Sequence, residues 1–259
     1  MQTRLPISSS TLCAIAAAAT LAAAPAFGSI VTDNPNGFAL RSGGAMTLAS
    51  QTEVAGSVGV AGALSRGWQS TVSGTVISNS VTGWNSPSFG SFTSGGSNIY
   101  LDWNQSRTLS AGSYGAFTSN SSTTLNLSAG TYAFSSFQLG WAGSVVADTS
   151  AGDVYVLVSG ALNAGDQTQF RTVGSGRLYL VSTGSASFGY HAEITAAVYS
   201  AASMTFGSET ALHGIAYAGG SLTTGYASHF EYSASPVPGP ASLALIGAAG
   251  IFGGRRRRR

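Results

Sequence analysis

Short apolar runs separated by glycine recur at a nearly constant interval along the second half of the chain. Four eleven-residue segments align on their glycines: GALNAGDQTQF (160–170), GSASFGYHAEI (184–194), ASMTFGSETAL (202–212) and GSLTTGYASHF (220–230). The sixth residue of each segment is glycine, at Gly165, Gly189, Gly207 and Gly225. The eleventh is apolar, at Phe170, Ile194, Leu212 and Phe230. The repeated glycine predicts a left-handed or tightly packed turn in every unit.

A second repeat extends this pattern toward the N-terminus. The segments LSAGSY (109–114) and LSAGTY (127–132) are separated by the same interval as the last three units, and tyrosine-centred apolar runs such as Val154-Tyr155-Val156 precede the glycine units. This period predicts an all-β chain folded as a right-handed β-solenoid, in which equivalent residues of rungs of about 18–20 residues stack about 4.8 Å apart. A β-sandwich or jelly roll stays the alternative, because the longer step from 160 to 184 and the irregular region before Leu109 interrupt the period.

The pattern divides the chain into four parts. Residues 1–28 are predicted to be a signal peptide, with Arg4 in its positive region, an apolar run over 12–24 and small residues at the cleavage site. Residues 29–108 form a β-rich or capping region, residues 109–235 the solenoid repeats, and residues 236–259 a C-terminal segment. The single cysteine, Cys13, lies in the signal peptide, so no disulfide or thiolate metal site is expected in the body.

The C-terminal segment combines prolines, an apolar run and a basic end. The apolar run over 241–254 would span about 21 Å as a helix, which is short against a hydrocarbon core of about 30 Å. The basic cluster after it would stay on the cytoplasmic side of the membrane. Its five residues are Arg255, Arg256, Arg257, Arg258 and Arg259.

This plan resembles the PEP-CTERM sorting segment of bacterial surface proteins. The proline motif is Val237, Pro238, Gly239 and Pro240, with Gly239 where that family has a glutamate between the prolines. The resemblance implies transient insertion of the C-terminal helix in the inner membrane and recognition by an exosortase-type sorting protease. It further implies cleavage near the proline motif, and a final place at the cell surface or in the extracellular matrix of a Gram-negative, polysaccharide-producing bacterium.

The order of segments between Leu109 and Tyr232 resembles bacterial surface proteins with bactofilin-like β-solenoid bodies. That resemblance rests on LSAG-[S/T]-Y, then DVYVLVSGALNAG, then RLYLVSTG and the glycine-centred units. It implies polymer-forming, matrix or adhesive proteins and carries no catalytic residues.

Charge excludes one class of partner. Only 8% of the residues are charged, lysine is absent, and between Ser29 and Ser235 five arginines stand against nine acidic residues, a net charge of −4. Nucleic-acid binding requires a basic face, so no nucleic-acid partner is expected.

Few residues could carry chemistry. Asp148, Asp153 and Asp166 are candidates for carbohydrate cleavage, but aspartates beside glycines more often cap local backbone groups in turns. The three histidines each have an acid nearby in sequence, yet their offsets from the unit glycines differ, so no metal site or other cofactor is predicted. These residues are His191, His213 and His229, with Glu193, Glu209 and Glu231. No local catalytic motif is present.

The favoured hypothesis is therefore an exported, non-enzymatic structural or adhesive protein of the cell surface or polysaccharide matrix. Its partners would be exopolysaccharide, other surface proteins or further copies of the chain. Exposed tryptophans are candidates for sugar stacking, although many tryptophans in an apolar chain belong to the core: Trp68, Trp84, Trp103 and Trp141. A secreted β-helix carbohydrate-active enzyme is the alternative. An ice-binding face is a third hypothesis, because Ser187, Thr205 and Thr223 share one repeat position.

Overall fold

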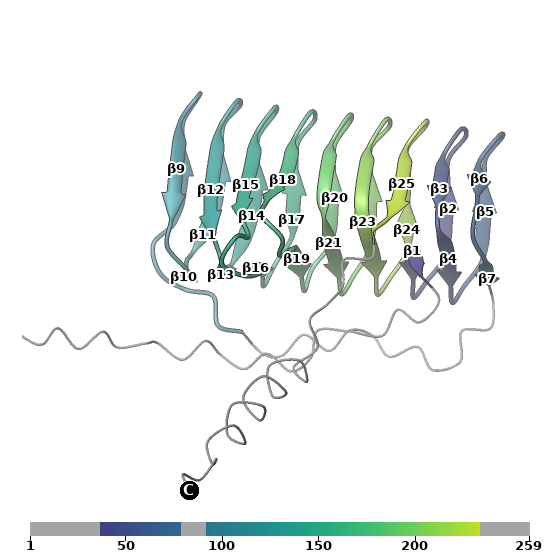
Figure 1. The fold of residues 1–259 in the computed structure, drawn as a ribbon, viewed down its shortest axis with the longest axis horizontal. Coiled ribbons are helices and arrows are strands. Elements are labelled where there is room, and N and C mark those ends of the chain that lie inside the picture. Colours follow the sequence, from purple (N-terminus) through teal and green to yellow (C-terminus); the bar gives the residue numbers. More distant parts are fainter. Residues whose placement is uncertain (1–36, 79–91, 234–259) are drawn as a thin grey trace, which may run out of the picture.

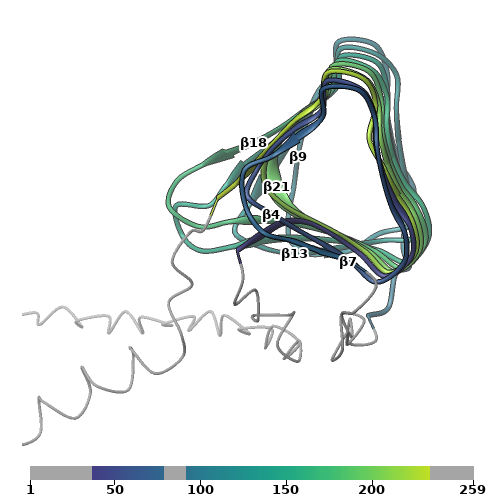
Figure 2. The same cartoon turned by 90° about the vertical axis from the view of Figure 1, so that its right-hand side faces the viewer.

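The computed structural model describes residues 37–78 and 92–233, which form one parallel β-solenoid with a triangular cross-section (Figures 1 and 2). The predicted β-solenoid is confirmed, and the sandwich alternative does not form. Every strand pairing in the described residues is parallel, and each of the three faces is a continuous ladder along the axis. No α-helix is present in these two ranges, so nothing in them is long and apolar enough to cross a membrane as a helix.

The first face is a nine-stranded sheet of short strands. In spatial order its strands are β8 (Ile99–Leu101), β11 (Ala116–Ser119), β14 (Ser136–Leu139), β17 (Leu162–Ala164), β20 (Ala186–Phe188), β22 (Met204–Phe206), β24 (Leu222–Thr223), β2 (Met46–Leu48) and β5 (Leu64–Arg66).

The other two faces belong to one sheet, because β21 (Glu193–Ser200) and β23 (Ala211–Ala218) each run across both. Besides the first halves of these strands, the second face contains β9 (Ser106–Leu109), β12 (Thr124–Ser128), β15 (Ser144–Asp148), β18 (Gln169–Val173), β25 (His229–Tyr232), β3 (Glu53–Ala55) and β6 (Thr71–Val72). Besides their second halves, the third face contains β10 (Gly112–Ser113), β13 (Gly130–Phe134), β16 (Val154–Val158), β19 (Leu178–Ser182), β1 (Phe38–Ser42), β4 (Ser57–Val60) and β7 (Val76–Ser78).

The register follows the repeat read from the sequence. The third residues of the four units form one ladder, Leu162, Ala186, Met204 and Leu222, and their eleventh residues form another. Because side chains alternate across a strand, these apolar residues all point into the core. Large rings stack there on neighbouring rungs, as Phe117 and Phe137 do with centroids 4.4 Å apart.

The order of rungs along the axis differs from the order of the sequence. Strand β1 completes the rung that β24 and β25 begin, because it pairs with β23 on one side and with β4 on the other. Strands β2 and β3 then pair with β24 and β25, and β5, β6 and β7 form the last rung. The N-terminal rungs therefore lie beside the C-terminal ones at one end of the stack (Figure 1).

The outer side of the third face carries a second apolar cluster, separate from the core. It contains Leu157, Tyr179, Val181, Ala197, Tyr199 and Tyr217, all buried, with Phe92 packed against them. Rings on neighbouring rungs stack, with 4.8 Å between the centroids of Tyr155 and Tyr179. This face is therefore largely withdrawn from solvent, and the first face, the second face and the corner between them remain exposed.

Candidate functional site

Nine aligned turns make the corner between the first and second faces. In each turn the third residue adopts a left-handed conformation, with φ between 51° and 59°. These nine are the positive-φ residues other than glycine in the described part of the chain: Gln51, Gln69, Asn104, Ser122, Ala142, Gln167, His191, Glu209 and Ala227. Left-handed backbone is unfavourable for residues with a Cβ, so a shared conformation on every rung indicates that the stack itself imposes it.

Backbone hydrogen bonds align these turns from rung to rung. Except for Gln69 on the last rung, the N–H of each left-handed residue donates to the carbonyl of the second turn residue on the next rung, as from Gln167 to Tyr190 (2.7 Å) and from Glu209 to Tyr226 (2.7 Å). The same bond also forms where the N-terminal rungs follow the C-terminal ones along the axis, from Ala227 to Ser50 (3.1 Å) and from Gln51 to Trp68 (2.8 Å). The corner is therefore as regular as the strands that flank it.

The repeat glycines are required by packing and not by a left-handed φ. Gly165, Gly189, Gly207 and Gly225 start their turns without a positive φ, and a Cβ on any of them would lie within 3.1 Å of backbone of the preceding rung. Of the two predicted alternatives, a left-handed or a tightly packed turn, these glycines show the second. A Cβ on Gly207 would lie 2.5 Å from the carbonyl carbon of Gly189. Buried hydroxyls close the same turns, since Thr210 Oγ1 donates to the Gly207 carbonyl at 2.8 Å.

The second residue of each turn points outward and forms what we call the corner row. In spatial order its members are Trp103, Ser121, Trp141, Asp166, Tyr190, Ser208, Tyr226, Ser50 and Trp68. Aromatic residues thus occupy every second rung, and small polar residues occupy the rungs between them. The five aromatic residues are between 43% and 68% exposed. This is an unusual density of exposed aromatic side chains for one edge of a protein.

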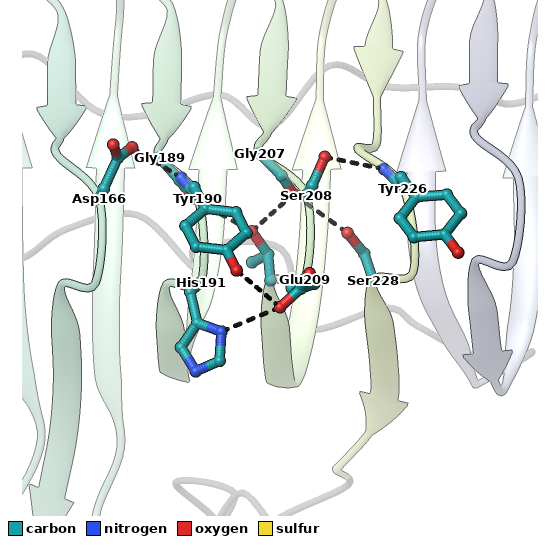
Figure 3. A network of polar contacts seen from close by, with 10 residues as sticks. Asp166, Gly189, Tyr190, His191, Gly207, Ser208, Glu209, Tyr226 and Ser228 are labelled. Atoms are coloured by element: carbon teal, nitrogen blue, oxygen red, sulfur yellow. Dashed lines mark hydrogen bonds and ion pairs between the residues drawn. The ribbon is translucent and has the colours of Figure 1, made fainter.

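The small residues of the corner row help to hold the aromatic ones (Figure 3). The Asp166 carboxylate accepts a hydrogen bond from the Tyr190 N–H at 2.8 Å, and the Ser208 hydroxyl accepts one from the Tyr226 N–H at 3.2 Å. The phenol of Tyr190 donates to Glu209 at 2.9 Å, a bond that also raises the pKa of the phenol. The phenol of Tyr226 donates to Gln51 at 2.6 Å. Both rings are therefore fixed at their base and at their tip.

A shallow open depression of about 460 Å³ lies beside the row. It is lined by Ala142, Gln167, Gln169, Tyr190, His191 and Glu193. Its amide, imidazole and carboxylate groups can donate and accept hydrogen bonds next to the exposed ring of Tyr190.

All three histidines pair with a glutamate of the next rung. The Nδ1 to Oε2 distances are 3.3 Å for His191 and Glu209, 2.9 Å for His213 and Glu231, and 3.3 Å for His229 and Glu53. The acids that are nearest in sequence are therefore not the partners, because stacking sets the neighbours. No group of three potential metal ligands occurs in residues 37–78 and 92–233.

Comparison with known proteins identifies the family and the fold. The family described as a domain of unknown function (DUF7305) matches residues 85–254, more than half of the chain. The chain belongs to this family. No curated protein matches it.

Solved structures that are similar to this DUF7305 chain include two from Antarctic sources. One is an ice-binding protein from the Antarctic ascomycete Antarctomyces psychrotrophicus, with 13% identity and a TM-score of 0.51 over 77% of this chain and 96% of that one. The other is an ice-binding protein from an Antarctic biological consortium, with 17% identity and a TM-score of 0.44 over 88% of this chain and 96% of that one. At such identities the likeness of the first shows the fold alone.

The aspartates considered for catalysis hold the backbone instead. The Asp148 carboxylate accepts from the Ser150 N–H at 3.0 Å, and hydrogen bonds to Ser150 lower the pKa of this carboxyl. Asp153 accepts from the Arg177 N–H at 2.8 Å. Asp166 lies at the corner of the row, whereas the other two lie at the corner between β15 and β16. The structure therefore does not gather them into one site.

A column of uncharged residues runs along the outside of the first face. Ser187, Thr205 and Thr223 are adjacent in it, as their shared repeat position predicts. Thr47 and Ser65 continue the column across the break in chain order. Sequence reasoning missed this continuation because β2 and β24 lie far apart along the chain.

Several sequence predictions fall outside the described residues. These are the signal peptide, Trp84, the proline motif from Val237 to Pro240 and the cluster from Arg255 to Arg259. The other three tryptophans, Trp68, Trp103 and Trp141, are exposed members of the corner row.

Proposed function

We propose that this chain is an exported, non-enzymatic structural or adhesive protein that contacts polysaccharide at the cell surface or in the extracellular matrix. The observation that carries the proposal is the corner row, with its five exposed aromatic rings on a rigid scaffold. Aromatic faces bind the C–H-rich faces of sugar rings, and rings already held in place lose little conformational entropy on binding. The low charge of the body suits uncharged or weakly charged glycans.

The proposal includes sorting by an exosortase-type protease at the proline motif around Pro238. The arrangement of prolines, apolar run and arginines supports it. Intact-mass and peptide mass spectrometry of the protein from membrane, surface and matrix fractions of the native host tests it. A surface or matrix form that ends near Pro238 is expected. A chain that is full-length in every fraction would contradict sorting.

Adhesion is tested by co-sedimentation of the purified full-length chain with the exopolysaccharide of its own host. A variant with all five row aromatics replaced by serine should keep the circular dichroism spectrum and lose binding. These substitutions are Trp68→Ser, Trp103→Ser, Trp141→Ser, Tyr190→Ser and Tyr226→Ser. Equal binding by this variant and the natural chain would show that the corner row does not contact the polysaccharide.

Ice binding is a second candidate, favoured by the column of hydroxyl residues on the first face. Ser187, Thr205, Thr223, Thr47 and Ser65 repeat at the rung spacing of about 4.8 Å on a flat sheet. The ascomycete protein that shares this fold is itself an ice-binding protein. Thermal hysteresis of the purified chain tests this candidate, and Thr205→Tyr should abolish the effect by breaking the flat column. No hysteresis in the natural chain would eliminate it.

A further inference from the structure

The alternation in the corner row sets a defined repeat. Neighbouring rungs are about 4.8 Å apart, so aromatic rings on every second rung repeat at about 9.6 Å, and the row from Trp103 to Trp68 is about 38 Å long. At this separation the rings cannot stack on one another, so no ring of the row covers another. The Tyr190 ring has the His191 ring as a neighbour, with 5.6 Å between centroids and a tilt of 44°. The residues between them are Ser121, Asp166, Ser208 and Ser50, which leave space beside each ring.

The alternation continues across the break in chain order. Tyr226 belongs to the last rung of the main stack, while Ser50 and Trp68 come from the N-terminal segment, far earlier in the chain. The aromatic period is therefore continuous over the surface of the assembled molecule, across a junction between segments that are far apart in sequence.

We infer that the corner row binds a single extended β-1,4-linked glycan chain of the cellulose or chitin type, laid parallel to the solenoid axis. This inference rests on the proposed function and names its ligand class. In such a chain successive sugars are turned over, so that every second sugar presents the same face in the same direction. The disaccharide repeat is close to two rungs, which lets one ring of the row contact each disaccharide. Coiled α-linked glycans present no straight repeat of this kind.

Polar groups beside the row fit the hydroxyl edges of this ligand. The depression next to Tyr190 places Gln167, Gln169 and Glu193 within reach of a chain that lies along the rings. Neutral amides and a carboxylate recognise sugar hydroxyls as donors and acceptors. The bonds from Tyr190 to Glu209 and from Tyr226 to Gln51 keep both rings in place before the ligand arrives.

The test compares three variants of the full-length chain in depletion assays with insoluble cellulose, chitin, insoluble starch and the host exopolysaccharide. The first variant, Tyr190→Ser with Tyr226→Ser, removes two rings. The second, Tyr190→Ser with Ser208→Tyr, keeps the number of rings and breaks their period. The third, Tyr100→Ser, removes an exposed aromatic residue of the first face, outside the row, and is the matched control. Circular dichroism and thermal unfolding verify the fold of each variant.

We expect the natural chain and the Tyr100→Ser control to bind cellulose or chitin and not starch. Removal of each ring should weaken binding about tenfold, and the period-shifted variant should bind no better than the variant with two rings removed. Equal binding of starch, or natural affinity in the period-shifted variant, would overturn this inference while leaving polysaccharide adhesion in place. Failure to bind any of the four glycans, the host exopolysaccharide included, would overturn both proposals.

Discussion

Two sets of outward-pointing aromatic residues on this solenoid have opposite surroundings. On the third face, Tyr155 and Tyr179 occupy neighbouring rungs and stack, and Tyr199 and Tyr217 lie 6.2 Å apart between centroids in a buried cluster. In the corner row, the rings occupy alternate rungs and remain exposed. Two features make the difference. Rings on consecutive rungs cover one another and rings on alternate rungs cannot, and Phe92 also packs over the third-face cluster.

The comparison shows that aromatic residues stabilise the fold when they occupy consecutive rungs, and are available for recognition when they occupy alternate rungs. Stacked rings bury their faces and hold neighbouring rungs together. Isolated rings stay 43% to 68% exposed and can contact another molecule. The two sets should therefore respond differently to the same substitution.

The largest expected effect is on the buried set. Tyr199→Ala removes a side chain that is only 3% exposed and should lower the free energy of unfolding by about 3–5 kcal/mol. Trp141→Ala, in the corner row, removes a side chain that is 51% exposed and should lower it by no more than about 1.5 kcal/mol while reducing glycan binding. Chemical denaturation and glycan depletion assays on both variants measure the two effects. Similar losses of stability in both would show that the corner row is structural.

A smaller effect is expected from alkaline pH on the buried phenols of the third face. Burial raises the pKa of Tyr217 from 10.0 to about 12, although nearby Arg41 opposes the shift, and burial also raises the pKa of Tyr179 and Tyr199. The unfolded chain therefore releases these protons first as the pH rises. The contribution of the neutral phenols is fully present below about pH 10 and is lost as the pH rises toward the folded pKa values.

Urea unfolding midpoints between about pH 8 and pH 11 measure this dependence. The midpoint should be flat up to about pH 9 and fall above pH 10. Tyr217→Phe should reduce the steepness of the fall, whereas Trp141→Phe, in the corner row, removes no ionisable group and should not. A midpoint that stays constant to pH 11 would contradict the burial of these phenols.

The repeated units of the second half were predictable in detail, because their period is local. The ladders through Leu162 and Phe170 follow directly from alignment on the glycines. The place of β1 was not predictable, since its contacts with β23 connect the two ends of the described chain and leave no local signal. The left-handed residues were also missed, because side chains as different as Ala142, Gln167 and His191 adopt the same φ.

The corner row was only partly visible in the sequence. Three of its members, Trp68, Trp103 and Trp141, were candidates for sugar contact, but the tyrosines were not. The sequence signal that was overlooked is the identity of the residue after each turn glycine. Along the main stack these residues are Trp141, Asp166, Tyr190, Ser208 and Tyr226. Alternation between rungs hides this signal from any search for identical residues at one repeat position.

The smallest expected effect comes from converting one set into the other. Ser121 lies between Trp103 and Trp141, so Ser121→Tyr would place rings on three consecutive rungs and let them stack as Tyr155 and Tyr179 do. Stacking should raise the free energy of unfolding by about 0.5–1 kcal/mol and weaken glycan binding, because the ring faces become covered. Ser121→Ala, which adds no ring, is the control in both measurements. Unchanged binding together with unchanged stability would mean that rings at this corner do not reach one another even on consecutive rungs, and that the period of the row has a cause other than keeping the ring faces open.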